Sequence, residues 1–125
     1  MEKPVISVIT PVFNEEECLP AFYERVVPIM EKIGLPFEII AVDDGSRDKS
    51  LEIISEHCKK DKRLKCVSFS RNFGQQAAFF CGLENCSGDA AILIDADLQD
   101  PPEIFPEMIA KWREGYDVVH GVRRV

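Results

Sequence analysis

The 125-residue sequence lacks the motifs of several large enzyme classes. It contains no Gly-x-x-x-x-Gly-Lys-Ser/Thr loop, which excludes a P-loop nucleotidase. No Gly-x-Gly-x-x-Gly follows the first expected strand, so a Rossmann dehydrogenase is not expected either. A Gly-x-Ser-x-Gly elbow is also missing, and with it the usual setting of a hydrolase nucleophile. Any chemistry must therefore depend on other side chains.

Basic residues are scarce: 15 Lys and Arg stand against 22 Asp and Glu, and the formal net charge is −7. A general nucleic-acid surface needs a basic stripe, so we expect no nucleic-acid partner. An anionic substrate stays compatible with this charge if a metal ion supplies the positive charge.

The five cysteines are scattered, their number is odd, and none belongs to a Cys-x-x-Cys pair. We therefore expect reduced thiols, no zinc and a cytoplasmic, soluble domain. No apolar run approaches the roughly 20 residues that span a bilayer, and no signal-peptide pattern opens the chain. The length suits one domain over residues 1–125, and the end directly after an expected strand suggests truncation at the C-terminus.

Apolar, β-branched runs alternate with amphipathic segments along the chain. This order, with connections long enough for crossovers, predicts an α/β fold with a mostly parallel sheet. The expected strands are 5–10, 37–42, 64–69, 90–94 and 116–120, and the expected helices begin near residues 19, 48, 75 and 104.

Several local features carry sharper expectations. Pro11 should end the first strand, and Pro28 should kink or break the first helix. Residues 64–69 alternate in polarity, which favours a strand near a sheet edge. Residues 75–85 are apolar almost all round, so we expect a well-buried helix, and the apolar run 90–94 predicts a strand covered on both faces.

Polar, charged and aromatic side chains follow the expected strands. Because the carboxyl ends of parallel strands meet at one edge of the sheet, we expect these residues to converge there. They are Phe13, Asn14 and Glu15; Asp43 and Asp44; Arg71 and Asn72; Asp95, Asp97 and Gln99; and Arg123.

The carboxylates of Asp95 and Asp97 would repel each other without a cation between them, and Mg²⁺ or Mn²⁺ is the natural guest. Phe13 can stack on a base, Asp43 can accept a hydrogen bond from a base or ribose, and Arg123 can contact a phosphate. These properties indicate a nucleoside-diphosphate site. The plainer interpretation is an acidic loop that follows a buried strand.

The chain resembles the family 2 glycosyltransferases with the Rossmann-like GT-A fold, in which helices cover both faces of the sheet. Within that family it is similar to the polyprenyl-phosphate sugar transferases of the dolichol-phosphate mannose synthase group. The matching motifs occur in family order: Thr10-Pro11-Val12-Phe13-Asn14-Glu15-Glu16, Val42-Asp43-Asp44-Gly45-Ser46, Ser70-Arg71-Asn72-Phe73-Gly74, Asp95-Ala96-Asp97-Leu98-Gln99-Asp100-Pro101-Pro102-Glu103 and Gly121-Val122-Arg123.

The resemblance implies roles for individual residues. Asp95 and Asp97 form the family's Asp-x-Asp motif at the catalytic centre, with Gln99 as a further ligand of a divalent cation. Phe13 replaces the more usual tyrosine in the nucleoside pocket, and Asp43 contacts the base. The implied nucleotide-sugar-binding residues are Pro11, Phe13, Asn14, Glu15, Asp43, Asp44, Asn72, Asp95, Ala96, Asp97 and Arg123.

The resemblance also implies a reaction. A sugar passes from a UDP- or GDP-sugar to an acceptor, which in this branch is a polyprenyl phosphate, by metal-assisted direct displacement. The full-length protein would act at the cytoplasmic face of a membrane, and an oligomer is compatible with the sequence. We expect residues 1–125 to bind the donor weakly and to turn over poorly or not at all, because the acceptor side lies outside them.

Three alternatives belong to other classes. An Asp-x-Asp phosphatase carries its motif after the first strand, whereas here the motif follows the fourth. A phosphoacceptor signalling domain needs an acidic pair after the first strand, where this chain has Phe13 and Asn14. A non-catalytic nucleotide-binding or scaffold domain stays open.

Overall fold

The structure is a computed structural model that describes residues 3–120. Four strands form one parallel sheet in the order β3-β2-β1-β4. The strands are β1 (Ile6–Val12), β2 (Phe37–Asp43), β3 (Leu64–Ser68) and β4 (Ala90–Leu93). The helices are α1 (Leu19–Ile33), α2 (Ser50–Lys60), α3 (Gln75–Asn85), the short 3₁₀ helix η1 (Pro102–Ile104) and α4 (Phe105–Arg113).

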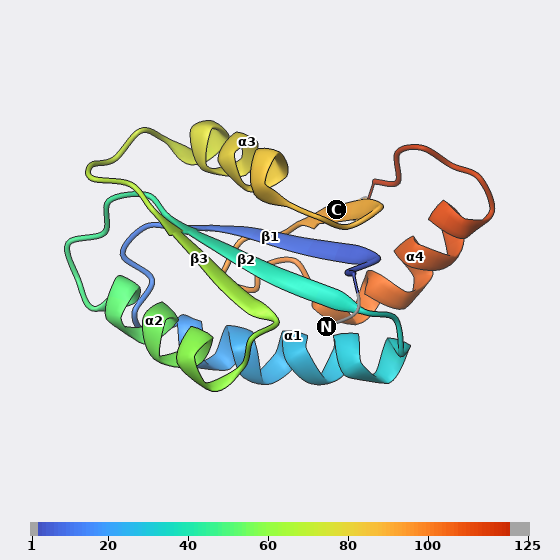
Figure 1. Cartoon of the computed structure of the whole chain (residues 1–125), viewed down its shortest axis with the longest axis horizontal. Helices are drawn as coiled ribbons and strands as arrows, with labels where there is room; N and C mark the ends of the chain where they lie inside the picture. Colours follow the sequence, from blue (N-terminus) through green and yellow to red (C-terminus); the bar gives the residue numbers. More distant parts are fainter. Residues whose placement is uncertain (1–2, 121–125) are drawn as a thin grey trace.

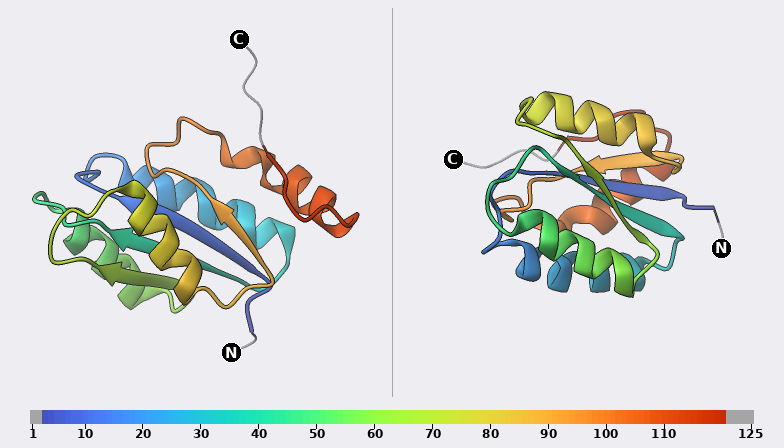
Figure 2. Two further views of the ribbon diagram at one scale, coloured as in Figure 1. Left: turned by 90° about the horizontal axis from the view of Figure 1, so that it is seen from above. Right: turned by 60° about the vertical axis from the view of Figure 1, so that its left-hand side comes forward.

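Helices lie on both faces of the sheet. Helix α3 packs on one face over β1 and β2, and α1 and α2 lie on the other face (Figure 1). Helix α4 lies beside β4, which is the edge strand on the opposite side of the sheet from β3 (Figure 2). The predicted α/β architecture with a parallel sheet is confirmed, and so is the edge position of β3.

The two faces of the sheet have cores of different size. The larger core lies on the face of α1 and α2 and includes Phe22, Met30 and Ile54 from these helices and Phe105 from α4. The smaller core, beneath α3, contains Ile40, Val42 and Ala78. The small size of the core beneath α3 explains why the sequence patterns of α3 and β4 predicted too much burial.

Pro11 does not end β1, which continues to Val12. In a parallel strand, alternate residues direct their backbone groups to the same neighbour. The carbonyl of Ile9 accepts the N–H of Ile94, so Ile9 and Pro11 both face β4. Because the paired part of β4 ends at Leu93, opposite Ile9, no hydrogen bond is lost at the proline.

The predicted break at Pro28 is also absent. Helix α1 is a single helix from Leu19 to Ile33, with Pro28 inside it and Pro20 in the first turn. It ends at Gly34, as predicted, where φ is 84° and the glycine N–H donates to the carbonyl of Met30.

Two predictions of burial were wrong. Helix α3 buries only Ala78 and Gly82, and its Phe80 side chain is 66% exposed. Strand β4 buries Ile92 but leaves Leu93 exposed. Helix α3 packs mainly over β1 and β2, so it leaves Leu93 of β4 exposed, and its own Phe80 faces solvent.

The predicted fifth strand is not present, because residues 116–120 form no strand in the structure. The motif that was expected to follow it, including Arg123, lies outside the described residues. All five cysteines are free thiols. Within residues 3–120 there is no helix that is both long enough and apolar enough to span a bilayer.

Candidate functional site

The loop after β1 places Phe13 at the surface and is hydrogen-bonded to the loop after β2. Phe13 is 43% exposed. Asn14 has a left-handed backbone, with φ of 54°, and its N–H donates to the Ser46 hydroxyl over 2.9 Å. Its side-chain carbonyl accepts the N–H of Arg47 over 2.8 Å. Asn14 therefore joins two loops, and its side chain is already used in that contact.

Asp43, the last residue of β2, is a buried carboxylate that is only half satisfied. Its side chain is buried, and its Oδ2 accepts the N–H of Ser46 over 3.3 Å. Its Oδ1 is buried and has no hydrogen-bond partner in the described part of the chain. Leaving a buried acceptor unpaired costs about 1–3 kcal/mol, so Oδ1 is an acceptor that a ligand can satisfy.

Asp44 has a different environment from Asp43. Its carboxylate accepts the N–H of Phe73 over 2.7 Å, the N–H of Gly74 over 3.0 Å and the side-chain amide of Asn72 over 3.0 Å. Gly45 follows, and a Cβ built there would lie 2.4 Å from the carbonyl carbon of Arg71. Asp44 therefore holds the loop between β3 and α3 against the end of β2.

The Asp-Ala-Asp segment follows β4, as predicted, with Ala96 and Asp97 in a turn and Asp95 directly before it. Strand β4 ends at Leu93, and Leu98 has a left-handed backbone with φ of 60°. Asp95 is half-buried and Asp97 is exposed. The N–H of Gln99 donates to Oδ1 of Asp97 over 3.2 Å, so the turn is closed by its own acidic side chain.

Four connections at the carboxyl edge of the sheet enclose a cavity of about 480 Å³. Eight of the predicted site residues line it, but Asn14, Asp43 and Gln99 do not, and Arg123 is outside the described residues. The lining residues are Pro11, Val12, Phe13, Glu15, Asp44, Asn72, Gly74, Gln75, Asp95, Ala96 and Asp97.

Sequence reasoning missed Val12, Gly74 and Gln75 as lining residues. Gln75 is the first residue of α3, and its side-chain amide donates to Oδ1 of Asp95. The sequence did contain a signal for Gln75 as a cavity residue, because it directly follows the Arg-Asn-Phe-Gly segment at an expected helix start. The sequence does not reveal its partner, which lies 20 positions away.

Among the described residues that line the cavity, four are acidic and none is basic: Glu15, Asp44, Asp95 and Asp97. Burial raises the pKa of the Cys18 thiol, and a hydrogen bond with Glu15 and the charges of Glu15 and Asp97 raise it further. Within residues 3–120 there is no cluster of three or more His, Cys, Asp or Glu side chains that would hold a metal by themselves. The two carboxylates of the predicted Asp-x-Asp motif, Asp95 and Asp97, both line the cavity.

A parallel α/β sheet with a polar cavity at the carboxyl ends of its strands is the architecture of the Rossmann-like class of domains. Residues 7–125 match the family model of Glycosyl transferase family 2, and the chain belongs to that family.

Two relatives and one solved structure illustrate the similarity. The uncharacterized glycosyltransferase YkcC of Bacillus subtilis (strain 168) is 48% identical over 117 residues, covering 94% of this chain and 36% of the relative. The undecaprenyl-phosphate 4-deoxy-4-formamido-L-arabinose transferase of Pectobacterium atrosepticum is 46% identical over 119 residues, covering 94% and 36%. The chain thus spans about a third of the length of these relatives.

The solved structure is glucosyl-3-phosphoglycerate synthase from Mycobacterium tuberculosis, in complex with Mn²⁺, UDP and glucosyl-3-phosphoglycerate. Its TM-score is 0.69 with 28% identity, and the match covers 87% of this chain and 39% of that one. This likeness confirms the predicted GT-A fold.

Proposed function

We propose that residues 1–125 form the donor-binding domain of a glycosyltransferase that uses a UDP- or GDP-sugar. The observation that carries this proposal is the convergence of Phe13, Asp95 and Asp97 on one cavity, from loops that follow different strands. An aromatic ring and a pair of carboxylates are the groups that a base and a metal-bound diphosphate require.

The donor set fits a hard divalent cation. Asp95 and Asp97 supply carboxylate oxygens, and Gln99, which follows them but does not line the cavity, carries an amide oxygen. Mg²⁺ is commonly held by one or two carboxylates together with substrate phosphates, so the pair Asp95 and Asp97 suits it or Mn²⁺. When bound, the cation supplies Lewis-acid stabilisation of the charge on the leaving diphosphate.

The nucleoside would occupy the part of the cavity next to β1 and β2. Phe13 offers a half-exposed ring face for the base. Asp43, whose Oδ1 is buried without a partner in the described chain, would accept a hydrogen bond from the base or ribose after a small loop movement. Pro11 and Glu15 line the same part of the cavity, and Arg123 is proposed to contact the phosphates.

For the whole protein we propose transfer to a polyprenyl phosphate at the cytoplasmic face of a membrane. The support is the name of a relative that acts on undecaprenyl phosphate. A phosphate oxygen of the acceptor attacks the anomeric carbon, the bond from this carbon to the diphosphate breaks, and the nucleoside diphosphate leaves. Because such an acceptor is already anionic, it needs little help from a general base.

Calorimetric titration of the chain with UDP and with GDP, each with and without Mn²⁺, tests the proposal. We expect binding of one nucleotide that depends on Mn²⁺ and is abolished in Asp97→Ala. Asp89→Ala is the matched control, because Asp89 lies just before the other end of β4 and its nearest ion-pair partner is Lys3. We expect this variant to bind like the parent chain.

Two results would contradict the proposal. Absence of binding to either nucleotide would favour a non-catalytic scaffold domain. Binding that is unchanged in Asp97→Ala would show that Asp97 does not hold a cation needed for nucleotide binding.

We expect no transfer to a polyprenyl phosphate from residues 1–125 alone, and measurable transfer would show that the acceptor side is also present.

A further inference from the structure

Gln75 joins helix α3 to the acidic turn after β4. Its side-chain Nε2 donates a hydrogen bond to Oδ1 of Asp95, and both residues line the cavity at the carboxyl edge. The contact is exposed to solvent, so it contributes little to folding. Its position beside a proposed cation ligand suggests a role in the site.

The backbone that carries Gln75 is held by a buried group. The N–H groups of Phe73 and Gly74, which directly precede Gln75, both donate to the Asp44 carboxylate, and Asp44 is 3% exposed. Gly74 has φ of 104°, which lets the chain turn sharply into α3. The start of α3 is therefore fixed relative to the end of β2, which limits the positions open to the Gln75 side chain.

We propose that Gln75 is a positioning residue that orients the Asp95 carboxylate for the divalent cation. The inference rests on the proposed function, because it needs a cation at Asp95 and Asp97. A neutral amide suits this role, because it holds one carboxylate oxygen by a hydrogen bond without neutralising the negative charge that attracts the cation. Such supporting contacts around a metal ligand commonly change metal affinity by about 10–100-fold.

The test compares nucleotide affinity with and without Mn²⁺ in the parent chain and in two variants, Gln75→Ala and Gln75→Met. Met preserves the length of the side chain and removes the donor. We expect both variants to weaken Mn²⁺-dependent binding about tenfold, at the low end of that range because the contact is exposed. The midpoint of thermal unfolding without ligands should stay unchanged in both variants, whereas a purely structural defect would lower it together with the affinity.

Gln76→Ala is the matched control, because Gln76 is the next residue of α3 and is exposed without a described side-chain partner. It should bind like the parent chain. Equal Mn²⁺-dependent affinities in Gln75→Ala, Gln75→Met and the parent chain would overturn the positioning role while leaving the proposed function standing. If the parent chain shows no Mn²⁺-dependent binding, the proposed function fails and this inference fails with it.

Discussion

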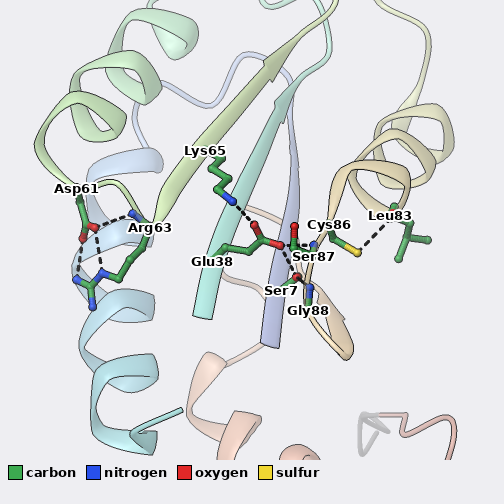
Figure 3. Close-up of polar contacts among 9 residues, drawn as sticks. All are labelled: Ser7, Glu38, Asp61, Arg63, Lys65, Leu83, Cys86, Ser87 and Gly88. Carbon is green, nitrogen blue, oxygen red and sulfur yellow. Dashed lines mark hydrogen bonds and ion pairs between the residues drawn. The ribbon is translucent and has the colours of Figure 1, made fainter. Parts of the chain in front are cut away.

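Glu38 and Lys65 form an ion pair in which one partner is buried and the other is half-exposed. The Lys65 ammonium donates to Oε1 of Glu38 over 2.6 Å, with side-chain exposures of 43% for Lys65 and 1% for Glu38. The other oxygen, Oε2, accepts the Ser7 hydroxyl and the Ser87 N–H, each over 2.6 Å (Figure 3). One carboxylate of β2 thus connects β1, β3 and the loop between α3 and β4.

The Glu38 contacts predict unequal effects of two substitutions on stability. Glu38→Gln should lower the free energy of unfolding by about 2 kcal/mol, because an amide group then faces donors that need an acceptor. Lys65→Met should cost about 1 kcal/mol, since Glu38 keeps its other two donors and water reaches the lysine end of the pair. Urea denaturation at pH 7 measures both. A larger loss in Lys65→Met than in Glu38→Gln would contradict this account.

The same carboxylate predicts a pH dependence of stability. Burial by itself raises the pKa of Glu38, but hydrogen bonds from Lys65, Ser7 and Ser87 outweigh it and bring the pKa below the usual 4.5. A group with a lowered pKa in the folded state stabilises the protein above its unfolded pKa, and this contribution is lost as the pH falls through the folded pKa.

The free energy of unfolding should therefore fall below about pH 4.5, and the difference between the parent chain and Glu38→Gln should shrink with it. Urea denaturation at pH 7, 5, 4 and 3 measures this difference. Glu38→Gln should still lose some stability in acid, because a hydrogen bond from Arg63 lowers the pKa of Asp61 as well. A constant difference at all four pH values would show that Glu38 does not titrate as expected.

Substitution of Asp44 should loosen the loop that precedes α3. Asp44→Asn keeps the size of the side chain but replaces an acceptor of three hydrogen bonds by a group that also donates, which should cost about 2–3 kcal/mol. The amides of Phe73 and Gly74 should exchange with solvent faster than in the parent chain. Glu84→Gln, on the exposed side of α3, should change neither quantity, and unaltered exchange in Asp44→Asn would refute the role of Asp44.

Gly45 and Gly34 form a matched pair for the effect of a close backbone contact. Both have a left-handed backbone, with φ of 73° and 84°. A Cβ at Gly34 meets nothing within 4 Å, whereas one at Gly45 would lie 2.4 Å from the backbone of Arg71. Thermal unfolding should therefore show a loss of about 1–2 kcal/mol for Gly34→Ala and clearly more for Gly45→Ala. Equal losses would show that the loop moves away at no cost.

The order of the elements could be predicted from the sequence alone. Runs such as Val5 to Thr10 are β-branched and apolar, and the spacing of Leu19, Phe22 and Val26 is helical. These signals are local, because they depend on backbone preference and on burial of one face. Parallel pairing follows from the long connections, and it brings the strand-end residues to one edge. The sequence therefore determined where Phe13, Asp95 and Asp97 would meet.

Only the tertiary structure decided what the individual polar groups do. Asp43 and Asp44 are adjacent and chemically identical, yet one has a buried oxygen without a partner within residues 3–120 and the other binds the loop before α3. The link between Gln75 and Asp95, and the pairing of Glu38 with Lys65, join segments far apart in the chain. Hydrogen-bond partners depend on distances of a few ångströms between separate elements, which periodicity and composition do not contain.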